Sequence, residues 1–138
     1  MKKPTILIAD DHVDSADALG LLMGLDFPEL GVAVTYGGRE ALQSASRQRP
    51  DVALLDMEMP EMDGETLAHA LQAMYPGQSP VMIAVSANLE RLDELRGNGL
   101  FDQCLDKPVD ADAILRIVRE RLTSIEDGPS GALKWSGQ

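Results

Sequence analysis

Four short segments that read as strands, each followed within two residues by a functional charged or hydroxyl side chain, place the strongest limit on the fold of this chain. The segments lead to Asp10 and Asp11, to Asp56, to Ser86 and to Lys107. The first three are continuous apolar runs, which are typical of parallel strands whose two faces are both covered. Because the carboxyl ends of parallel strands meet at one edge of a sheet, we expect these polar groups to lie close together.

Segments with helical spacing alternate with the apolar runs. The expected strands are Thr5 to Ala9, Val32 to Tyr36, Val52 to Leu55, Val81 to Val85 and Phe101 to Leu105. The first expected helix runs from about Ser15 to Leu25. A second contains Ala41, Leu42 and Ala45 on its inner face and ends before Pro50. Three more are expected over Glu65 to Met74, Leu89 to Arg96 and Ala111 to Leu122. Strands that alternate with helices predict an α/β fold with a parallel sheet and helices on both faces.

Two details of these elements are open to a direct check. Asp14 or Ser15 is expected to cap the first helix, since short polar side chains are preferred there. The last strand carries Asp102 and Gln103 in its middle, so we expect it at or near an edge of the sheet.

Length and composition indicate one domain. The chain has 138 residues, of which 44% are hydrophobic, enough for a single core. We expect this domain to cover residues 1–124. Residues 125–138, rich in Gly and Ser, are expected to form a disordered tail that includes the single tryptophan, Trp135.

Charge and cysteine content exclude several classes of function. The formal net charge of -11 disfavours direct binding to nucleic acid or to anionic lipid. The apolar runs are too short to cross a membrane, and no signal-peptide pattern precedes the first strand. Cys104 is the only cysteine, so the chain cannot form an internal disulfide or a cysteine metal cluster. A reducing cytoplasm is the expected location.

The residues at the strand ends predict phosphoryl chemistry assisted by a metal. Three carboxylates that converge cannot all stay ionised without a counter-charge. Mg²⁺ provides that charge and prefers oxygen ligands, so we expect Asp10, Asp11 and Asp56 to form its site. Asp56 would then be the nucleophile toward phosphorus, with Lys107 and Ser86 stabilising the charge on the phosphoryl oxygens.

Several segments together resemble one family. They are Ile6-Leu-Ile-Ala-Asp10-Asp11-His12, Gly37-Gly-Arg-Glu-Ala-Leu42, Asp51 to Gly64 around Asp56, Val85-Ser86-Ala87 and Leu105-Asp-Lys107-Pro108. Over about residues 4–124 the chain resembles the response-regulator receiver domain of two-component phosphorelay signalling. The resemblance implies a flavodoxin-like, doubly wound, five-stranded parallel sheet in the order 2-1-3-4-5, with five helices on its two faces.

The resemblance also implies roles for individual residues. Asp56 would be phosphorylated from a phosphohistidine on a sensor histidine kinase or a histidine phosphotransfer protein. Asp11 and Asp56 would bind Mg²⁺ through their side chains, Glu58 through its backbone carbonyl and Asp10 largely through water. The family further implies a cis peptide before Pro108.

The same resemblance describes a signalling domain and not an enzyme with a separate substrate. It would catalyse only its own phosphorylation and dephosphorylation, and would switch a contact surface for a protein effector that is unknown. The family also allows a homodimer through the fourth helix, the fifth strand and the fifth helix. Because no effector domain follows residue 124, the chain is expected to be either a stand-alone regulator or a receiver taken from a longer protein.

Three positions call for separate expectations. Receiver domains usually carry Tyr or Phe three residues before the lysine, and here Cys104 stands at that position, so signal transmission must use other groups. Glu58 and Asn88 occupy positions that, in the family, influence hydrolysis of the phosphoryl group. His12 is expected to be a loop residue and not a ligand, because no second histidine is suitably placed for a transition metal.

Other classes share part of this pattern. A phosphatase of the haloacid-dehalogenase type needs an Asp-x-Asp motif, whereas position 58 is Glu and the acidic pair comes first. A flavin-binding module shares the sheet topology, but Asp10, Asp11 and Asp14 would repel its phosphate. A receiver-like scaffold that signals without phosphorylation would be expected to lack an acid, the nucleophile or the lysine. This sequence retains all of them.

Overall fold

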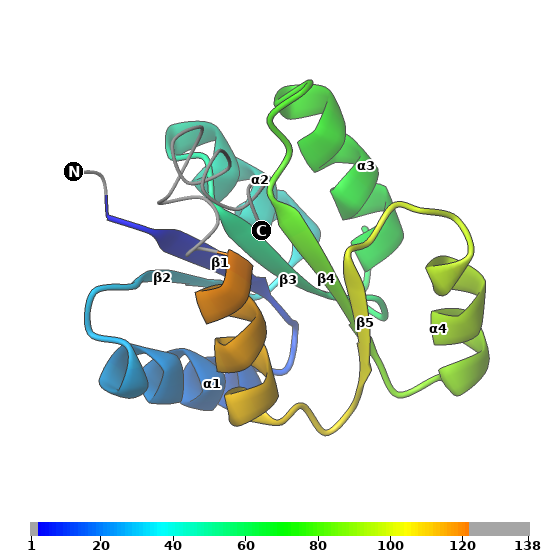
Figure 1. The fold of residues 1–138 in the computed structure, drawn as a ribbon. Helices are drawn as coiled ribbons and strands as arrows, with labels where there is room; N and C mark the ends of the chain where they lie inside the picture. Colours follow the sequence, from blue (N-terminus) through cyan, green and yellow to red (C-terminus); the bar gives the residue numbers. More distant parts are fainter. Residues whose placement is uncertain (1–2, 122–138) are drawn as a thin grey trace, which may run out of the picture.

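The structure is a computed structural model that describes residues 3–121, in which strands and helices alternate (Figure 1). The strands are β1 (Thr5–Ala9), β2 (Gly31–Thr35), β3 (Val52–Asp56), β4 (Val81–Ser86) and β5 (Gln103–Asp106). The labelled helices are α1 (Val13–Asp26), α2 (Gly38–Arg47), α3 (Gly64–Met74) and α4 (Leu89–Arg96). A final helix, orange in Figure 1, occupies residues 111–121.

The strands form one parallel sheet in the order β2-β1-β3-β4-β5. This confirms the flavodoxin-like arrangement expected from the sequence. β3 lies in the middle and all five of its residues are buried, which is why its sequence is apolar throughout until Asp56. β5 lies at an edge, as its polar residues predicted.

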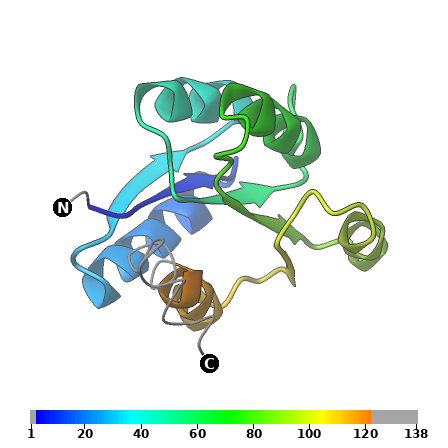
Figure 2. The ribbon, with the colours of Figure 1, turned by 45° about the horizontal axis from the view of Figure 1, so that its top comes forward.

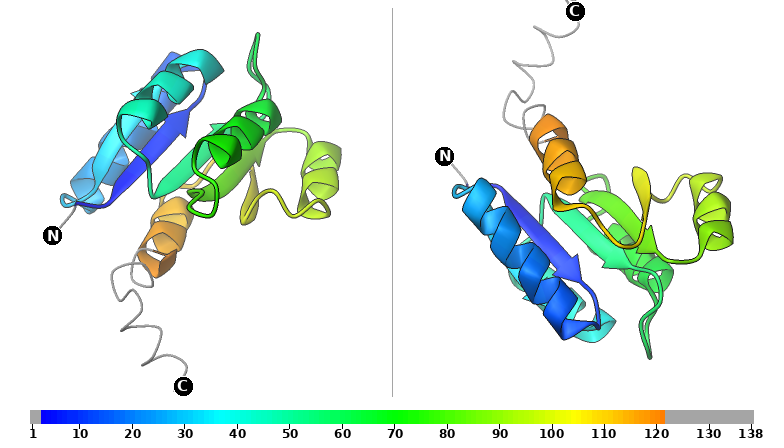
Figure 3. Two further views of the ribbon diagram at one scale, coloured as in Figure 1. Left: turned by 90° about the horizontal axis from the view of Figure 1, so that it is seen from above. Right: turned by 90° about the horizontal axis from the view of Figure 1, so that it is seen from below.

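Helices cover both faces of the sheet. Figures 2 and 3 show α1 and the final helix on one face and α2 and α3 on the other, with α4 beside β5. Because successive strand residues point to opposite faces, Ile8 and Leu54 pack with α1 and the final helix, whereas Leu7 and Leu55 pack toward α2 and α3. None of the helices within residues 3–121 is long and apolar enough to span a lipid bilayer.

The start of α1 differs from the sequence-based expectation. The helix begins at Val13 with His12 at the N-cap, and the His12 side chain makes no capping hydrogen bond, so the expectation of Asp14 or Ser15 as the cap was wrong. The reason lies upstream. The Asp10 carboxylate accepts a hydrogen bond from the His12 backbone N–H at 2.9 Å, which turns the chain into the helix two residues earlier.

Smaller differences occur at other element ends. β2 ends at Thr35, whose hydroxyl donates to the Ile8 carbonyl at 2.7 Å. β5 begins two residues later than expected, at Gln103, because the Asp102 carboxylate, and not a strand carbonyl, accepts from the Met82 N–H at 2.8 Å. Leu122 and the expected tail, residues 125–138 with Trp135, lie outside the described residues.

The loop between β3 and α3 folds back tightly on the end of β3. Met57 and Met59 are buried in the core, so this apolar part of the loop packs inward. A Cβ atom added at Gly64 would lie 2.2 Å from Cε of Met57 and 2.5 Å from the Asp56 carbonyl oxygen. Only glycine therefore allows α3 to begin so close to Asp56.

Candidate functional site

The sheet register brings the polar residues at the strand ends to one edge. Ala9 pairs with Leu55, so Asp10 lies level with Asp56 at the ends of β1 and β3. Asp56 pairs with Val85, and Ser86 pairs with Asp106, the residue before Lys107. The parallel arrangement thus explains why residues almost a hundred positions apart meet.

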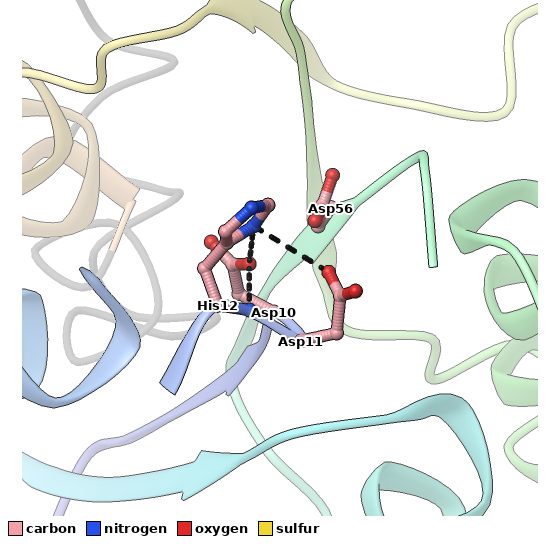
Figure 4. Close-up of side chains that lie close together, drawn as sticks. All are labelled: Asp10, Asp11, His12 and Asp56. Atoms are coloured by element: carbon pink, nitrogen blue, oxygen red, sulfur yellow. Dashed lines mark hydrogen bonds and ion pairs between the residues drawn. The ribbon is translucent and has the colours of Figure 1, made fainter. Parts of the chain in front are cut away.

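The acidic residues expected at this edge do converge. Asp10, Asp11 and Asp56, together with His12, each offer a ligand atom, and these atoms all lie within 4.8 Å of one another (Figure 4). Nδ1 of His12 lies 3.4 Å from the Asp10 carboxylate and 3.6 Å from that of Asp11. His12 is a residue of the loop before α1, as expected, but sequence reasoning did not place its ring against the carboxylates.

Asp56 is the most enclosed of these acids. Its side chain is 1% exposed, and Oδ1 accepts a hydrogen bond from the Glu58 N–H at 3.1 Å. Oδ2 lies 3.1 Å from Nζ of Lys107, an ion pair that lacks hydrogen-bond alignment. One carboxylate oxygen is therefore anchored by the backbone, and the other faces a positive charge.

Burial dominates the electrostatics of Asp56. It raises the pKa of this carboxyl to about 6, and the Asp10 charge acts in the same direction. The Glu58 N–H and the Lys107 ammonium oppose the increase without cancelling it. A raised pKa means that ionising Asp56 costs free energy here, and a further positive charge at the site would reduce that cost.

The chemistry of the cluster fits a hard divalent cation. Oδ1 of Asp11 and Oδ2 of Asp56 are buried and have no hydrogen-bond partner. Buried oxygens in this state are costly unless a donor or an ion compensates them. Carboxylate oxygens are the ligands that Mg²⁺ prefers.

Ser86 lies in a different set of contacts. Its side chain is buried, and Oγ donates to the Glu58 carboxylate, with both Oε1 and Oε2 at 2.8 Å. The same Oγ accepts a hydrogen bond from the Asn88 N–H at 2.9 Å. The structure therefore brings Ser86 to the expected edge but places its hydroxyl on Glu58 and not on Asp56.

Lys107 is held by its backbone as well as by its ion pair. Its N–H donates to the Ser86 carbonyl at 3.1 Å, which ties it to the end of β4. The Lys107–Pro108 peptide is cis, as the resemblance implied. The Lys107 ammonium thus approaches Asp56 from the end of β5, the strand that pairs with β4.

The ion pairs of Arg91 connect the N-termini of α3 and α4 close to Ser86 and Glu58. Asn88 caps α4 by accepting from the Arg91 N–H, and Asp63 caps α3 by accepting from the Thr66 N–H at 2.8 Å. The Arg91 guanidinium lies 3.3 Å from both Asp63 and Glu65. Burial would raise the pKa of Asp63, but hydrogen bonds from Thr66 and Arg91 outweigh it and lower this pKa.

Cys104 lies in β5 opposite Ala84 and is half-buried. Burial raises the pKa of its thiol, against the opposing charge of Arg96. A raised thiol pKa makes the reactive thiolate scarce, in keeping with a small packing residue.

A cavity of about 540 Å³ adjoins the site between α1 and the start of the final helix. Its apolar part is lined by Leu19, Leu22 and Val109, and Asp10, Asp56 and Lys107 lie at its polar part. Leu22 is 48% exposed, so it does not belong to the buried face of α1.

Comparison with known proteins identifies the family. The chain matches the family model of the response regulator receiver domain over residues 6–119. It is 37% identical over 109 residues to a response regulator receiver protein of Anaeromyxobacter sp. (strain Fw109-5), covering 79% of this chain and 44% of that protein. It is 32% identical over 118 residues to an uncharacterized 14.6 kDa protein of Leptolyngbya boryana, covering 83% of this chain and 87% of that one.

The fold agrees with solved receiver structures. The signal receiver domain of a DNA-binding response regulator from Colwellia psychrerythraea superposes with a TM-score of 0.78 at 23% identity, covering 88% of this chain and 99% of that one. The chain spans about half or less of the length of several curated relatives that it matches. On the family match and its relatives, this chain belongs to the response regulator receiver domains of two-component signalling.

Proposed function

We propose that Asp56 accepts a phosphoryl group from a phosphohistidine on a sensor histidine kinase or a histidine phosphotransfer protein. The observation that carries this proposal is the state of the Asp56 carboxylate. It is almost fully buried, and Oδ2 has no hydrogen bond but lies 3.1 Å from the Lys107 ammonium. An oxygen in this position is free to attack and has a positive charge beside it.

In this reaction an Asp56 carboxylate oxygen forms the new O–P bond. The P–N bond of the phosphohistidine breaks, and its electron pair returns to the imidazole nitrogen of the donor. Lys107 stabilises the negative charge on the phosphoryl oxygens, and Ser86 would donate its hydroxyl to one of them. The carboxyl of Asp56 must be ionised to attack, and because burial raises its pKa to about 6, the positive charge of Lys107 favours the ionised form.

We assign Mg²⁺ binding to the side chains of Asp11 and Asp56 and to the backbone carbonyl of Glu58, with the Asp10 carboxylate acting largely through water. The buried oxygens of Asp11 and Asp56 that lack hydrogen-bond partners support this set. When bound, the ion would supply positive charge that offsets the repulsion among the three carboxylates and allows the phosphoryl oxygens to approach them.

The proposed output is a change in a protein contact surface, and the chemistry is limited to the domain's own phosphorylation and dephosphorylation. Some relatives are named transcriptional regulatory proteins. Because the net charge of -11 repels anionic surfaces, we propose that this chain acts on a protein effector and makes no direct contact with nucleic acid or membrane. Pairing of two copies through α4, β5 and the final helix stays a prediction, as does the cytoplasmic location.

The test is magnesium-dependent labelling by acetyl phosphate and by a phosphorylated histidine phosphotransfer protein, followed by intact mass. We expect labelling of the wild-type protein and complete loss in Asp56→Asn. Asp14→Asn is the matched control, since Asp14 is an exposed residue in the first turn of α1, and it should label normally. Labelling that persists in Asp56→Asn would contradict the assignment.

A further inference from the structure

We propose that Glu58 is a positioning residue: its carboxylate holds the Ser86 hydroxyl while Asp56 is unphosphorylated, and it must release that hydroxyl before Ser86 can bind a phosphoryl group. This inference rests on the proposed function. It differs from the binding of a metal by the Glu58 carbonyl, because it concerns the side chain alone. Substitutions at position 58 can therefore test it while the backbone carbonyl remains.

The contact between the two residues is short and specific. Oγ of Ser86 lies 2.8 Å from both carboxylate oxygens of Glu58. Ser86 is 0% exposed, so water cannot replace this acceptor in the present conformation. A hydroxyl that donates to a carboxylate makes a charge-assisted bond, which is stronger than one between neutral groups.

The hydroxyl has no spare donor. It carries one proton, which Glu58 accepts, and one of its lone pairs accepts from the Asn88 N–H at 2.9 Å. A phosphoryl oxygen on Asp56 offers only acceptors. Ser86 can therefore donate to it only after the bond to Glu58 breaks.

Glu58 is also placed to respond to new negative charge. Its backbone N–H is bonded to Oδ1 of Asp56, which keeps position 58 next to the phosphoryl acceptor. Within residues 3–121 no basic side chain lies within ion-pairing distance of the Glu58 carboxylate. Repulsion from a phosphoryl group would thus favour movement of this exposed side chain away from Ser86.

Release of the Ser86 hydroxyl from Glu58 would alter the contacts at the start of α4. The Asn88 N–H bonded to Ser86 belongs to the residue that caps this helix, and Arg91 of the first turn reaches Asp63 and Glu65 at the start of α3. This route passes through β4 and α4 and does not use position 104. It offers a path for the signal in a chain where Cys104 replaces the usual aromatic residue.

A first experiment measures the contact without phosphorylation. Thermal unfolding of the wild-type protein, Glu58→Ala, Ser86→Ala and the double variant forms a double-mutant cycle. We expect clear non-additivity: Ser86→Ala should lower the melting temperature less in the Glu58→Ala background than in the wild type. Glu61→Ala, which removes another exposed carboxylate from the same loop, should be additive with Ser86→Ala. Additive effects of Glu58→Ala would overturn the proposal.

A second experiment measures the consequence for phosphorylation with acetyl phosphate and Mg²⁺. We expect Glu58→Ala to raise the labelling rate about tenfold or more, as expected for removal of one competing charge-assisted hydrogen bond. In the Ser86→Ala background the same change should have almost no effect, and Glu58→Gln should lie between the wild type and Glu58→Ala.

The alternative is that Glu58 acts only by repelling the incoming anion. The increase would then be equal in both backgrounds, and this result would overturn the positioning role. If the wild-type protein is not labelled at all, the proposed function fails, whereas the unfolding cycle still decides whether Glu58 holds Ser86. The two failures are thereby distinguishable.

Discussion

Two halves of the same sheet edge differ in how their polar groups are satisfied. The acidic half, formed by Asp10, Asp11, His12 and Asp56, has buried carboxylate oxygens without hydrogen-bond partners. The bonded half, formed by Glu58, Ser86, Asn88, Arg91 and Asp63, is held by hydrogen bonds and ion pairs of 2.8 to 3.3 Å. The comparison indicates that binding capacity is concentrated where buried carboxylate oxygens lack hydrogen bonds, while the hydrogen-bonded groups hold the starts of α3 and α4 in place.

The largest expected effect is on the metal affinity of the acidic half. Asp11→Ala should weaken Mg²⁺ binding at least about tenfold, because it removes a proposed ligand, and loss of even an outer-shell partner commonly costs this much. Titration calorimetry measures the affinity, with Asp14→Ala as the control of equal charge change. Magnesium should also raise the wild-type melting temperature, since a ligand that binds the folded state stabilises it. If Asp11→Ala bound Mg²⁺ with unchanged affinity, the acidic half would not be the metal-binding part of this sheet edge.

The next effect concerns stability in the bonded half. Asp63→Ala should lower the free energy of unfolding by about 1 kcal/mol, because it removes the cap of α3. The pKa of Asp63 is lowered by folding, so its contribution is present above the unfolded pKa of about 3.9 and is lost as the pH falls through the folded pKa. Urea unfolding at neutral and acidic pH should therefore show a difference that shrinks in acid.

Glu65→Ala is the control for this measurement. Glu65 shares the Arg91 contact at 3.3 Å but does not cap the helix, so its loss should cost less. Equal losses for the two variants would mean that Arg91, and not the cap, accounts for the effect of Asp63.

The smallest effect has the opposite sign and again involves Asp11. With magnesium removed by a chelator, Asp11→Ala should raise the free energy of unfolding by about 0.5 kcal/mol, because it relieves repulsion among partly exposed like charges. The same type of substitution would thus stabilise the acidic half and destabilise the bonded half. Urea unfolding checks the sign, and a loss as large as that for Asp63→Ala would show that the halves do not differ.

The sequence predicted the architecture and the convergence of the acids because both follow from strand order and register. Apolar runs that end in polar residues define strand ends, and parallel pairing then brings Asp10 and Asp56 level. The family resemblance supplied the strand order itself, which alternation alone leaves open.

The details that escaped prediction depend on local competition between side chains. Asp10 turns the chain so that α1 begins at Val13, although Asp14 and Ser15 are good capping residues. The Ser86 hydroxyl selects Glu58 as its acceptor, a choice that depends on side-chain rotamers and not on spacing. Such choices become visible only when neighbouring strands and loops are assembled.

The absence of a side chain at Gly64 has a consequence for how this domain can vary. The loop that carries Glu58 is clamped between Asp56 and the first turn of α3, and a single added carbon would collide with the main chain of Asp56. Exposed positions near this loop can accept other side chains, but position 64 cannot accept any side chain without moving the main chain of Asp56. Sequence variation in this domain must therefore leave Gly64 in place.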